Sequence, residues 1–599
     1  MRVSLSTYVN FKRKLKTSEE SEYQSVLTRG KELVSNSCDG RTILIAHSAS
    51  MPQDKLYNTG AGFIGSKKGM EFIKFAKKYW GINEIQLLPT GQYHLKKDRC
   101  PIFSGSSMDF GNHMINIEDF LKSDELKKIA ESNQESNKIN YKNIITTDSA
   151  QEKALENLFK NMPQELKVEF IDFKKNLPER LETKSIYHAL TNIYGNSDTN
   201  KWSEIDRNLY NKNIISDKDR LKRLSEIKNS KHEIINFYLF KQFLAEKSLK
   251  DTVNRLHREG IRLNGDMICG FSKDEVWANP EAFIKDVNIG WGLPALDLKN
   301  PAAETLIREK ANFYAKFFDG IRVDASWTYI TPSLHNKYNK QPLEKEYYGD
   351  KFLNIIEDEV QKVKGAEYNS KFIMHEFAAK KTDFDMYDGT ELKPIVKNRV
   401  KIFTSDYLNA NYGTNFAFNK KGWTKDYYIL GATNHDSKKI SVDKNQADVL
   451  AKILKLDKTK LYNLREFIKA KFAEPMSAKN TMIMFNNALG INESFGANSE
   501  FSDNYKFKIP ENFEEIYHNA LQNGEGFNPM DSLEKLFVAK GLDKSEKELF
   551  KKIVKYRKIL ERKEHHSFNK KTASIVIALV GLTISAAYFL SKPNKKDYD

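Results

Sequence analysis

The sequence predicts an α/β protein built on parallel strands, arranged either as a doubly wound sheet or as a (β/α)8 barrel. Short apolar segments of strand length alternate with amphipathic helical patterns over most of the chain. Such alternation produces parallel strands joined by crossover helices. Three of the expected strands also end on an acidic residue. In a barrel the carboxyl ends of all strands lie at one face, so these acids can converge there.

The expected strands are rich in β-branched and apolar residues. They lie at 41–48, 84–89, 261–269, 319–324, 371–377 and 427–436. Helical patterns lie between several of them, at 69–81, 248–260, 302–320 and 352–365. Residues 121–243 are almost wholly helical and polar, which indicates a helical subdomain inserted into the α/β core.

Composition indicates a large globular protein of a reducing compartment. The chain has 599 residues, of which 40% are hydrophobic and 29% charged. Cys38, Cys100 and Cys269 lie far apart and form no CxxC pair, which argues against a zinc site and a disulfide framework. The N-terminus lacks the apolar core of a signal peptide. We therefore expect the folded part in the cytoplasm.

The C-terminal segment carries much of the net charge of +16. Residues 551–571 hold nine Lys or Arg against two Glu, and no basic stripe elsewhere indicates a nucleic-acid groove. Residues 572–591 are uncharged and flanked by lysines, as in a transmembrane tail anchor. A buried C-terminal helix is the alternative. The flanking charges place the main body at the cytoplasmic face of a membrane, with a single-pass anchor.

The segment before the predicted anchor, 541–571, reads as a basic helical linker. It opens on a capping box of Ser545 and Glu548 and continues as a lysine-rich helix. Two interpretations stay open. The helix either rests on anionic lipid headgroups or is a solvated spacer.

Three acids at the ends of expected strands are the candidate catalytic residues: Asp324, Glu376 and Asp436. For any single acid, a helix N-cap is the more ordinary role. The joint pattern favours a site, because Arg322 lies two residues before Asp324 and His435 directly precedes Asp436. On a strand, Arg322 and Asp324 project to the same face.

The chemistry that requires such a set is glycosyl transfer. A carboxylate beside an arginine keeps a low pKa and stays ionised, as a nucleophile must, so Asp324 fits that role. A carboxyl with apolar neighbours has a raised pKa and protonates the leaving oxygen, which fits Glu376. Asp436 would then bind sugar hydroxyls and strain the ring. No Gly-rich phosphate loop or metal-ligand cluster is evident, so no cofactor and no metal are expected.

These segments resemble the amylomaltases, the 4-α-glucanotransferases of glycoside hydrolase family 77 in the α-amylase clan. "IRVD" is similar to the family's V-R-I-D strand, "HEFA" to its A-E-D-L and "NHD" to its T-H-D. The resemblance implies that Asp324 is the nucleophile, Glu376 the acid/base and Asp436 the transition-state stabiliser. Arg322 and His435 match the supporting positions. It also implies the (β/α)8 barrel.

Further similar blocks run in the same order from about residue 41 to 510. Within "GDMICGFSKDEVWANP", Asp266 is a candidate for a supporting role in the pocket, with a structural aspartate as the alternative. Trp277 and Trp291 are candidates for stacking on sugar rings. Core packing is the stronger expectation for Trp277. His94 and His113 are expected at the surface.

Several positions differ from the family pattern. Ala325 stands where the family has histidine, Phe377 where it has aspartate, and "SKK" where it has N-D-T after H-D. The family's long acceptor loop after W-A-N-P is shortened here to residues 281–301. The resemblance therefore describes a divergent member.

The sequence as a whole predicts a 4-α-glucanotransferase that moves maltodextrin segments between α-1,4-glucans by a retaining double displacement. An α-glucan hydrolase of the same clan and a catalytically silent, membrane-tethered glucan-binding protein are the alternatives. The expected domains are a catalytic barrel at 1–540 with the insertion at 121–243, the linker at 541–571 and the anchor at 572–591. The expected partners are glucan donor and acceptor and the membrane, but no nucleic acid.

Overall fold

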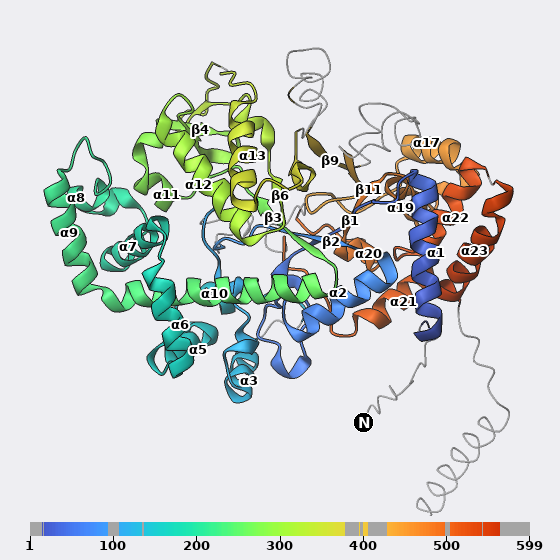
Figure 1. Ribbon diagram of the computed structural model, residues 1–599, viewed down its shortest axis with the longest axis horizontal. Coiled ribbons are helices and arrows are strands. Elements are labelled where there is room, and N and C mark those ends of the chain that lie inside the picture. Colours follow the sequence, from blue (N-terminus) through green and yellow to red (C-terminus); the bar gives the residue numbers. More distant parts are fainter. Residues whose placement is uncertain are drawn as a thin grey trace, which may run out of the picture.

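Eight parallel strands form a closed barrel at the centre of the molecule (Figure 1). The computed structural model describes residues 15, 17–93, 107–133, 137–344, 346–377, 395, 399–404, 428–496, 504–541 and 543–562. The strands pair in the order β1-β11-β10-β9-β8-β6-β3-β2, and β2 closes the ring on β1. This confirms the predicted (β/α)8 barrel.

The barrel strands are short and largely buried. They are β1 (Thr42–Ala46), β2 (Glu84–Leu87), β3 (Arg262–Met267), β6 (Gly320–Val323), β8 (Ile373–His375), β9 (Val400–Thr404), β10 (Tyr428–Gly431) and β11 (Asn480–Met484). Parallel strands covered on both faces are expected to be near-continuous apolar runs, as β1 is. Six of the eight match expected strands, and β9 and β11 were not predicted.

Helices surround the barrel and extend from it on two sides (Figure 1). Their bounds are α1 (Thr17–Ser35), α2 (Lys67–Trp80), α3 (Ser123–Ser132), α4 (Tyr141–Ile145), α5 (Ala150–Lys160), α6 (Gln164–Lys175), α7 (Glu179–Tyr194), α8 (Glu204–Arg207), α9 (Asp217–Ser230), α10 (His232–Arg258), α11 (Lys273–Ala278), α12 (Pro301–Phe317), α13 (Lys351–Lys364), α17 (Lys444–Leu454), α18 (Lys458–Leu461), α19 (Leu464–Met476), α20 (Phe485–Ala488), α21 (Phe513–Asn523), α22 (Pro529–Lys540) and α23 (Lys547–Glu561).

The region between β2 and β3 contains helices α3 to α10 among its described residues. Helices α5 to α9 lie together at one end of the molecule, and the 27-residue α10 runs from them back to the barrel (Figure 1). A second sheet follows α11. Its strands are β4 (Phe283–Ile289), β5 (Leu293–Leu296) and β7 (His335–Asn336), in the order β5-β4-β7. The shortened acceptor segment therefore forms an antiparallel hairpin.

The predicted membrane helix is corrected by the structure. Among the described residues, no helix has both the length and the apolar character that crossing a bilayer requires. α10 is long enough, but acidic and basic side chains recur along it. The predicted anchor, residues 572–591, lies outside the described residues. The transmembrane helix in the predicted fold class and the membrane-anchored location are therefore both corrected.

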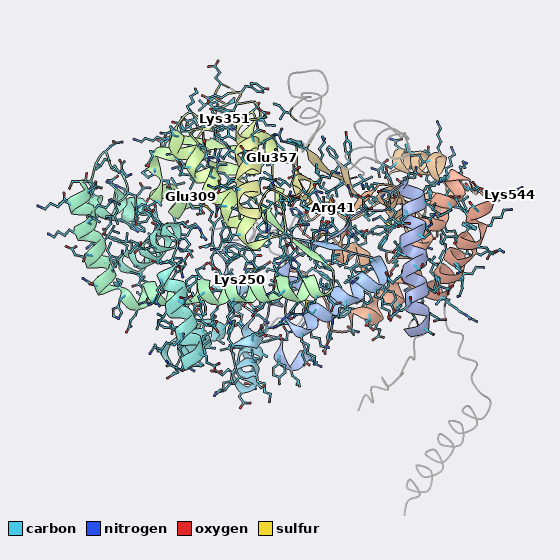
Figure 2. All side chains as sticks on the ribbon, in the orientation of Figure 1. Arg41, Lys250, Glu309, Lys351, Glu357 and Lys544 are labelled. Atoms are coloured by element: carbon cyan, nitrogen blue, oxygen red, sulfur yellow. The ribbon has the colours of Figure 1, made fainter. Side chains whose placement is uncertain are left out.

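The first part of the predicted linker belongs to the folded body. α23 packs against α1 and α22, and buries Ile553, Tyr556 and Leu560. The Tyr556 hydroxyl donates to Glu22 of α1 at 2.5 Å. The expected capping box of Ser545 and Glu548 is instead formed by Asp543 and Glu546, two residues earlier. Charged side chains such as Lys351 and Lys544 project from the outer surface (Figure 2).

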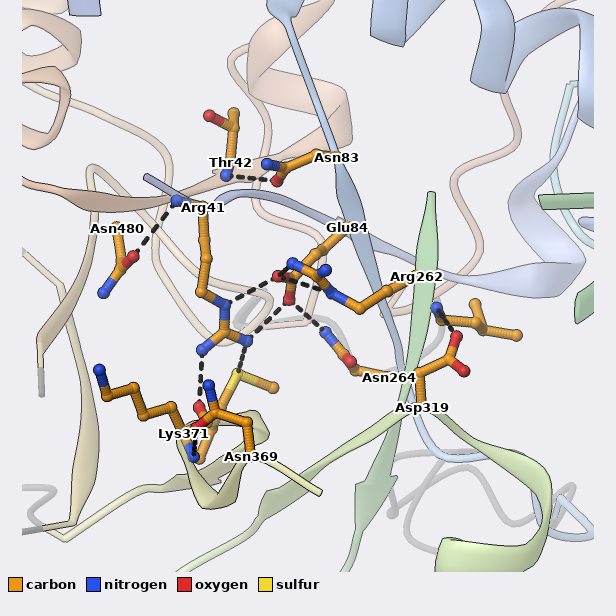
Figure 3. A network of polar contacts seen from close by, with 12 residues as sticks. Arg41, Thr42, Asn83, Glu84, Arg262, Asn264, Asp319, Asn369, Lys371 and Asn480 are labelled. Atoms are coloured by element: carbon orange, nitrogen blue, oxygen red, sulfur yellow. Dashed lines mark hydrogen bonds and ion pairs between the residues drawn. The ribbon is translucent and has the colours of Figure 1, made fainter. Parts of the chain in front are cut away.

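A buried ionic cluster lies where the barrel strands begin (Figure 3). Glu84, the first residue of β2, accepts from Arg41 through both oxygens, at 2.8 and 2.7 Å. Arg262 donates to one of these oxygens at 2.5 Å, and the Asn264 amide to the other at 3.0 Å. Burial alone would raise the pKa of Glu84, but the two guanidinium charges outweigh it and lower the pKa. The cluster links β1, β2 and β3.

We expect Glu84→Ala to destabilise the barrel by about 3 to 5 kcal/mol, because it leaves two arginines without their buried partner. Urea unfolding followed by circular dichroism measures the change. Glu548→Ala is the matched control, since Glu548 pairs with Lys551 at the exposed surface. An equal shift of the unfolding midpoint in both variants would contradict a structural role for this cluster.

Candidate active site

The site is organised around the Arg322 guanidinium, which contacts three carboxyl groups. Its Nη1 atom lies 2.6 Å from Asp266 Oδ1. Its Nη2 atom lies 3.0 Å from Asp324 Oδ1 and 2.7 Å from Glu376 Oε2. Because Asp324 and Glu376 contact the same nitrogen atom, their oxygens are near neighbours. Retaining glycosidases need their two carboxyl groups close together, at about 5 to 5.5 Å.

Strand order explains why these residues meet. β3, β6 and β8 are consecutive in the barrel, and Asp266 is the register partner of Arg322. Asp324 follows β6 directly and Glu376 follows β8 directly. All three acids therefore lie at the carboxyl ends of adjacent strands, where barrel enzymes carry their sites.

The electrostatics separate the two acids that follow β6 and β8. Burial raises the pKa of Glu376 to about 8, and the charge of Asp324 adds to the effect against the attraction of Arg322. Burial alone would also raise the pKa of Asp324. The Arg322 charge and a hydrogen bond from Glu376 outweigh burial, so the pKa of Asp324 lies below its ordinary value. At neutral pH Asp324 is therefore ionised and Glu376 protonated.

Asp266 is the most enclosed of the three acids, with 1% of its surface exposed. Burial raises its pKa to about 6 despite the Arg322 charge. Its Oδ2 atom has no hydrogen-bond partner among the described residues. A buried polar atom without a partner is costly, so this oxygen is suited to bind a group that enters the pocket.

His435 and Asp436 follow β10 and stand at the same end of the barrel. His435 Nε2 lies 3.3 Å from Asp436 Oδ2, and the Tyr505 hydroxyl donates to Asp436 Oδ1 at 2.8 Å. The charge of Asp436 contributes to the raised pKa of Glu376. Asp436 is the most exposed acid of the set, with 59% of its side chain accessible. It therefore lies at the open side of the site.

Trp277 lies apart from the carboxylates. It packs edge-on against Trp202 and Tyr210, and its indole donates to the Asp206 carbonyl at 2.9 Å. This is core packing between α11 and the helical insertion. Trp291 belongs to the short 3-10 turn Gly290–Gly292 between β4 and β5, and its side chain lies outside the described part.

Sequence reasoning missed three features of this region. Cys269 is buried where β3 ends, and its thiol hydrogen bonds with Asp324. Its position two residues after β3 was the available signal. Tyr505 reaches Asp436 from a distant loop that no local pattern indicated. His113, expected at the surface, is buried and stacks on Tyr93 with ring centroids 4.0 Å apart, while His94 lies outside the described residues.

Comparison with known proteins gives the same family as the motifs. Residues 46–300 match the model of glycoside hydrolase family 77, described as 4-alpha-glucanotransferase. The family resemblance is confirmed. The chloroplastic/amyloplastic 4-alpha-glucanotransferase of Solanum tuberosum is 25% identical over 254 residues, 41% of each chain. The chain thus matches about two-fifths of this curated relative. Of the carboxylates that Arg322 contacts, only Asp266 lies within the matched residues.

Two amylomaltase structures share the fold. That from Streptococcus agalactiae, in complex with acarbose, has a TM-score of 0.62 and 14% identity, over 82% of this chain and 100% of that one. That from Corynebacterium glutamicum has a TM-score of 0.57 and 12% identity, over 85% and 76%. The carboxylates that follow β6, β8 and β10 therefore lie in a fold that is shared with these two amylomaltases.

We expect Asp324→Asn to lower the pKa of Glu376, because the Asp324 charge is the larger of the two neighbouring negative charges that raise it. Carbon-13 NMR of the labelled Glu376 carboxyl measures the titration. Asp436→Asn, which removes the weaker of these charges, should lower the same pKa less. The reverse order would contradict the contact geometry around Arg322.

Proposed function

We propose that the chain is a 4-α-glucanotransferase that transfers maltodextrin segments between α-1,4-glucans with retention of configuration. One observation carries the proposal: Asp324 and Glu376 contact the same Arg322 nitrogen while their pKa values are shifted in opposite directions. A nucleophile and a general acid are required in these two protonation states at neutral pH. The family match of residues 46–300 supports the same reaction.

In the first step an ionised Asp324 oxygen forms a bond to the anomeric carbon of the donor. The bond from that carbon to the glycosidic oxygen breaks, and Glu376 gives its proton to the departing oxygen. Asp324 then carries the glucan as an ester, and Glu376 is a carboxylate. Arg322 stays within reach of both groups and balances the charge that moves between them.

In the second step the Glu376 carboxylate removes the proton of an acceptor 4-hydroxyl. The acceptor oxygen bonds to the anomeric carbon, and the bond to Asp324 breaks. Two displacements at one carbon restore the original configuration. Asp436 and Asp266 are proposed to accept hydrogen bonds from sugar hydroxyls, with His435 orienting Asp436 at 3.3 Å. Water as the acceptor would give hydrolysis, so exclusion of water decides the outcome.

The decisive experiment incubates pure protein with maltotriose and separates the products by chromatography. We expect glucose together with a ladder of longer oligomers. Glu376→Gln should lose about 10²- to 10⁴-fold in rate, because it removes the general acid. Glu367→Gln is the matched control, since Glu367 is exposed before the same strand. Glucose and maltose without longer products would show that the protein hydrolyses maltotriose and does not transfer segments. The absence of any turnover would contradict the proposal as a whole.

The pH dependence of kcat/KM should show an alkaline limb near pH 8. Glu376 must be protonated in the first step, and its pKa is about 8, so activity is present below this pH and lost above it. On the acid side, activity should persist until Asp324 takes up a proton, below the ordinary range for aspartate. Initial rates of maltotriose turnover from pH 4 to 10 measure both limbs. A profile that is flat between pH 7 and 10 would contradict the assignment of Glu376.

A further inference from the structure

A second polar arrangement lies directly behind the two carboxyls that follow β6 and β8. Ser326, at the start of the 3-10 helix Ser326–Tyr329, has its Oγ atom 3.1 Å from Nδ1 of His375. His375 is the last residue of β8, and its Nε2 atom lies 3.2 Å from Oε1 of Glu357 on α13. Figure 2 shows Glu357 on the barrel-covering α13. Ser326 is 0% and His375 1% exposed.

The order serine, histidine, carboxylate is that of a nucleophilic triad, but the burial excludes this use. The Ser326 hydroxyl is enclosed, and the Val323 carbonyl lies within hydrogen-bond distance of it, at 3.0 Å. Arg399 binds Glu357 through Nε at 2.5 Å and so fixes the carboxylate end of the Ser326, His375 and Glu357 arrangement. A substrate carbonyl has no access to this hydroxyl. The arrangement must act on its neighbours within the protein.

Its neighbours are the two segments that carry the proposed nucleophile and acid. The Glu376 amide donates to the Val323 carbonyl at 3.1 Å, and the Ser326 amide donates to the Glu376 carbonyl at 2.8 Å. The contact of Ser326 with His375 is a third link between the same segments. Asp324 lies between Val323 and Ser326 in the chain, so the links surround it on both sides.

Ala325 makes this geometry possible at a conformational cost. Its φ of 46° lies in the left-handed region, which is unfavourable by about 1 to 2 kcal/mol for a residue with a Cβ. This turn directs the Ala325 amide toward Glu376 Oε2 at 3.4 Å and the Ser326 amide toward the Glu376 carbonyl. A strained residue persists only where surrounding contacts hold it. The links made by Ser326 supply such contacts.

The proton on His375 is fixed by its surroundings. The charged groups that face the ring are Glu357 on α13, Arg399 before β9 and Lys401 within β9. Burial lowers the pKa of His375, so the ring is neutral at pH 7. An ionised Glu357 only accepts hydrogen bonds, which places the ring proton on Nε2. Nδ1 is then an acceptor, and it shares the single Ser326 hydroxyl proton with the Val323 carbonyl.

We propose that His375 and Ser326 are positioning residues that set the separation of the Asp324 and Glu376 carboxyls. The proposal deepens the proposed function and rests on it. Glu357 and Arg399 anchor the His375 ring, and the ring fixes Ser326 against the ends of β6 and β8. Phe377 stacks on the same ring, with centroids 5.2 Å apart and planes 16° apart. This packing prevents the ring from turning away from Ser326.

Three variants test the proposal with maltotriose as substrate. In Ser326→Ala and in His375→Gln, which keeps a donor toward Glu357 but loses the Nδ1 acceptor, kcat should fall about 10- to 100-fold, because small misplacements of reacting groups are costly. KM should stay within about twofold, since neither residue faces the substrate. His257→Gln is the matched control. His257 pairs with Asp319 at 2.8 Å at the opposite end of β6, and its loss should change neither constant.

The pH profile separates positioning from general destabilisation. If the two carboxyls move apart, Asp324 raises the pKa of Glu376 less, and the alkaline limb should move down by about half a unit or more. His375→Asn should have a higher kcat than His375→Gln, because the shorter amide is able to reach the Ser326 hydroxyl. Unchanged kcat and an unchanged limb in Ser326→Ala would overturn the proposal. So would an equal loss in His257→Gln.

One readout does not depend on turnover. Long-range proton–nitrogen NMR of histidine-labelled protein should show His375 as the neutral Nε2–H tautomer, with an Nδ1 signal that moves in Ser326→Ala. Carbon-13 titration of Glu376 in the same variant should give a lower pKa. If wild-type protein shows no turnover, the proposed function fails, whereas a protonated or Nδ1–H His375 overturns the positioning role itself.

Discussion

The site depends on one guanidinium group, that of Arg322, being shared by three carboxyl groups. If Asp266, Asp324 and Glu376 were all ionised, three negative charges would share one positive charge in a largely buried place. Desolvation and mutual repulsion make that state unfavourable. A carboxyl keeps its proton where neighbouring groups offset the cost of its buried charge least. The pKa therefore rises to about 8 for Glu376 and to about 6 for Asp266, while it falls for Asp324. The opposite pKa shifts of Asp324 and Glu376 follow from this shortage of positive charge.

The closed barrel supplies the geometry that makes this sharing possible. β3, β6 and β8 are adjacent, so one side chain on β6 reaches acids on both neighbouring strands. β10 is separated from β8 by β9, and Asp436 accordingly does not contact Arg322 but is bound by His435 and Tyr505. At the other end, Glu84 holds Arg41 and Arg262 where β1, β2 and β3 begin. Clusters of paired charges therefore lie at both ends of the barrel, and we propose chemistry only for the one around Arg322.

Six barrel strands and the Arg322–Asp324 pair are predicted from the sequence, because each depends on residues that are neighbours in the chain. Arg322 and Asp324 share a strand face at a spacing of two, and six apolar strands follow period and composition. β9 was missed because Lys401 interrupts it, and β11 because Asn480 and two methionines of "NTMIM" are not β-branched. Trp277 was open to two interpretations because its surroundings come from the distant α7 to α8 region. The links of Ser326 with His375 arise only when β6 and β8 pair, which no local pattern reveals.

Two of the departures from the family pattern, Ala325 and Phe377, lie at this same junction. Ala325 adopts a left-handed turn, and the next residue, Ser326, contacts His375 of β8 and Glu376 directly after it. Phe377 packs on the His375 ring that Ser326 contacts. Substitutions that do not contact one another would each change the carboxyl separation without a compensating neighbour. Here the contacts are continuous. Ser326, next to Ala325, contacts the His375 ring, and Phe377 stacks on that ring. The short distances from Arg322 to Asp324 and Glu376 are retained beside them. At this junction Ala325, Ser326, His375 and Phe377 therefore form one connected set of contacts beside the Arg322 carboxylates, and it is through this set that we propose the spacing of Asp324 and Glu376 is held.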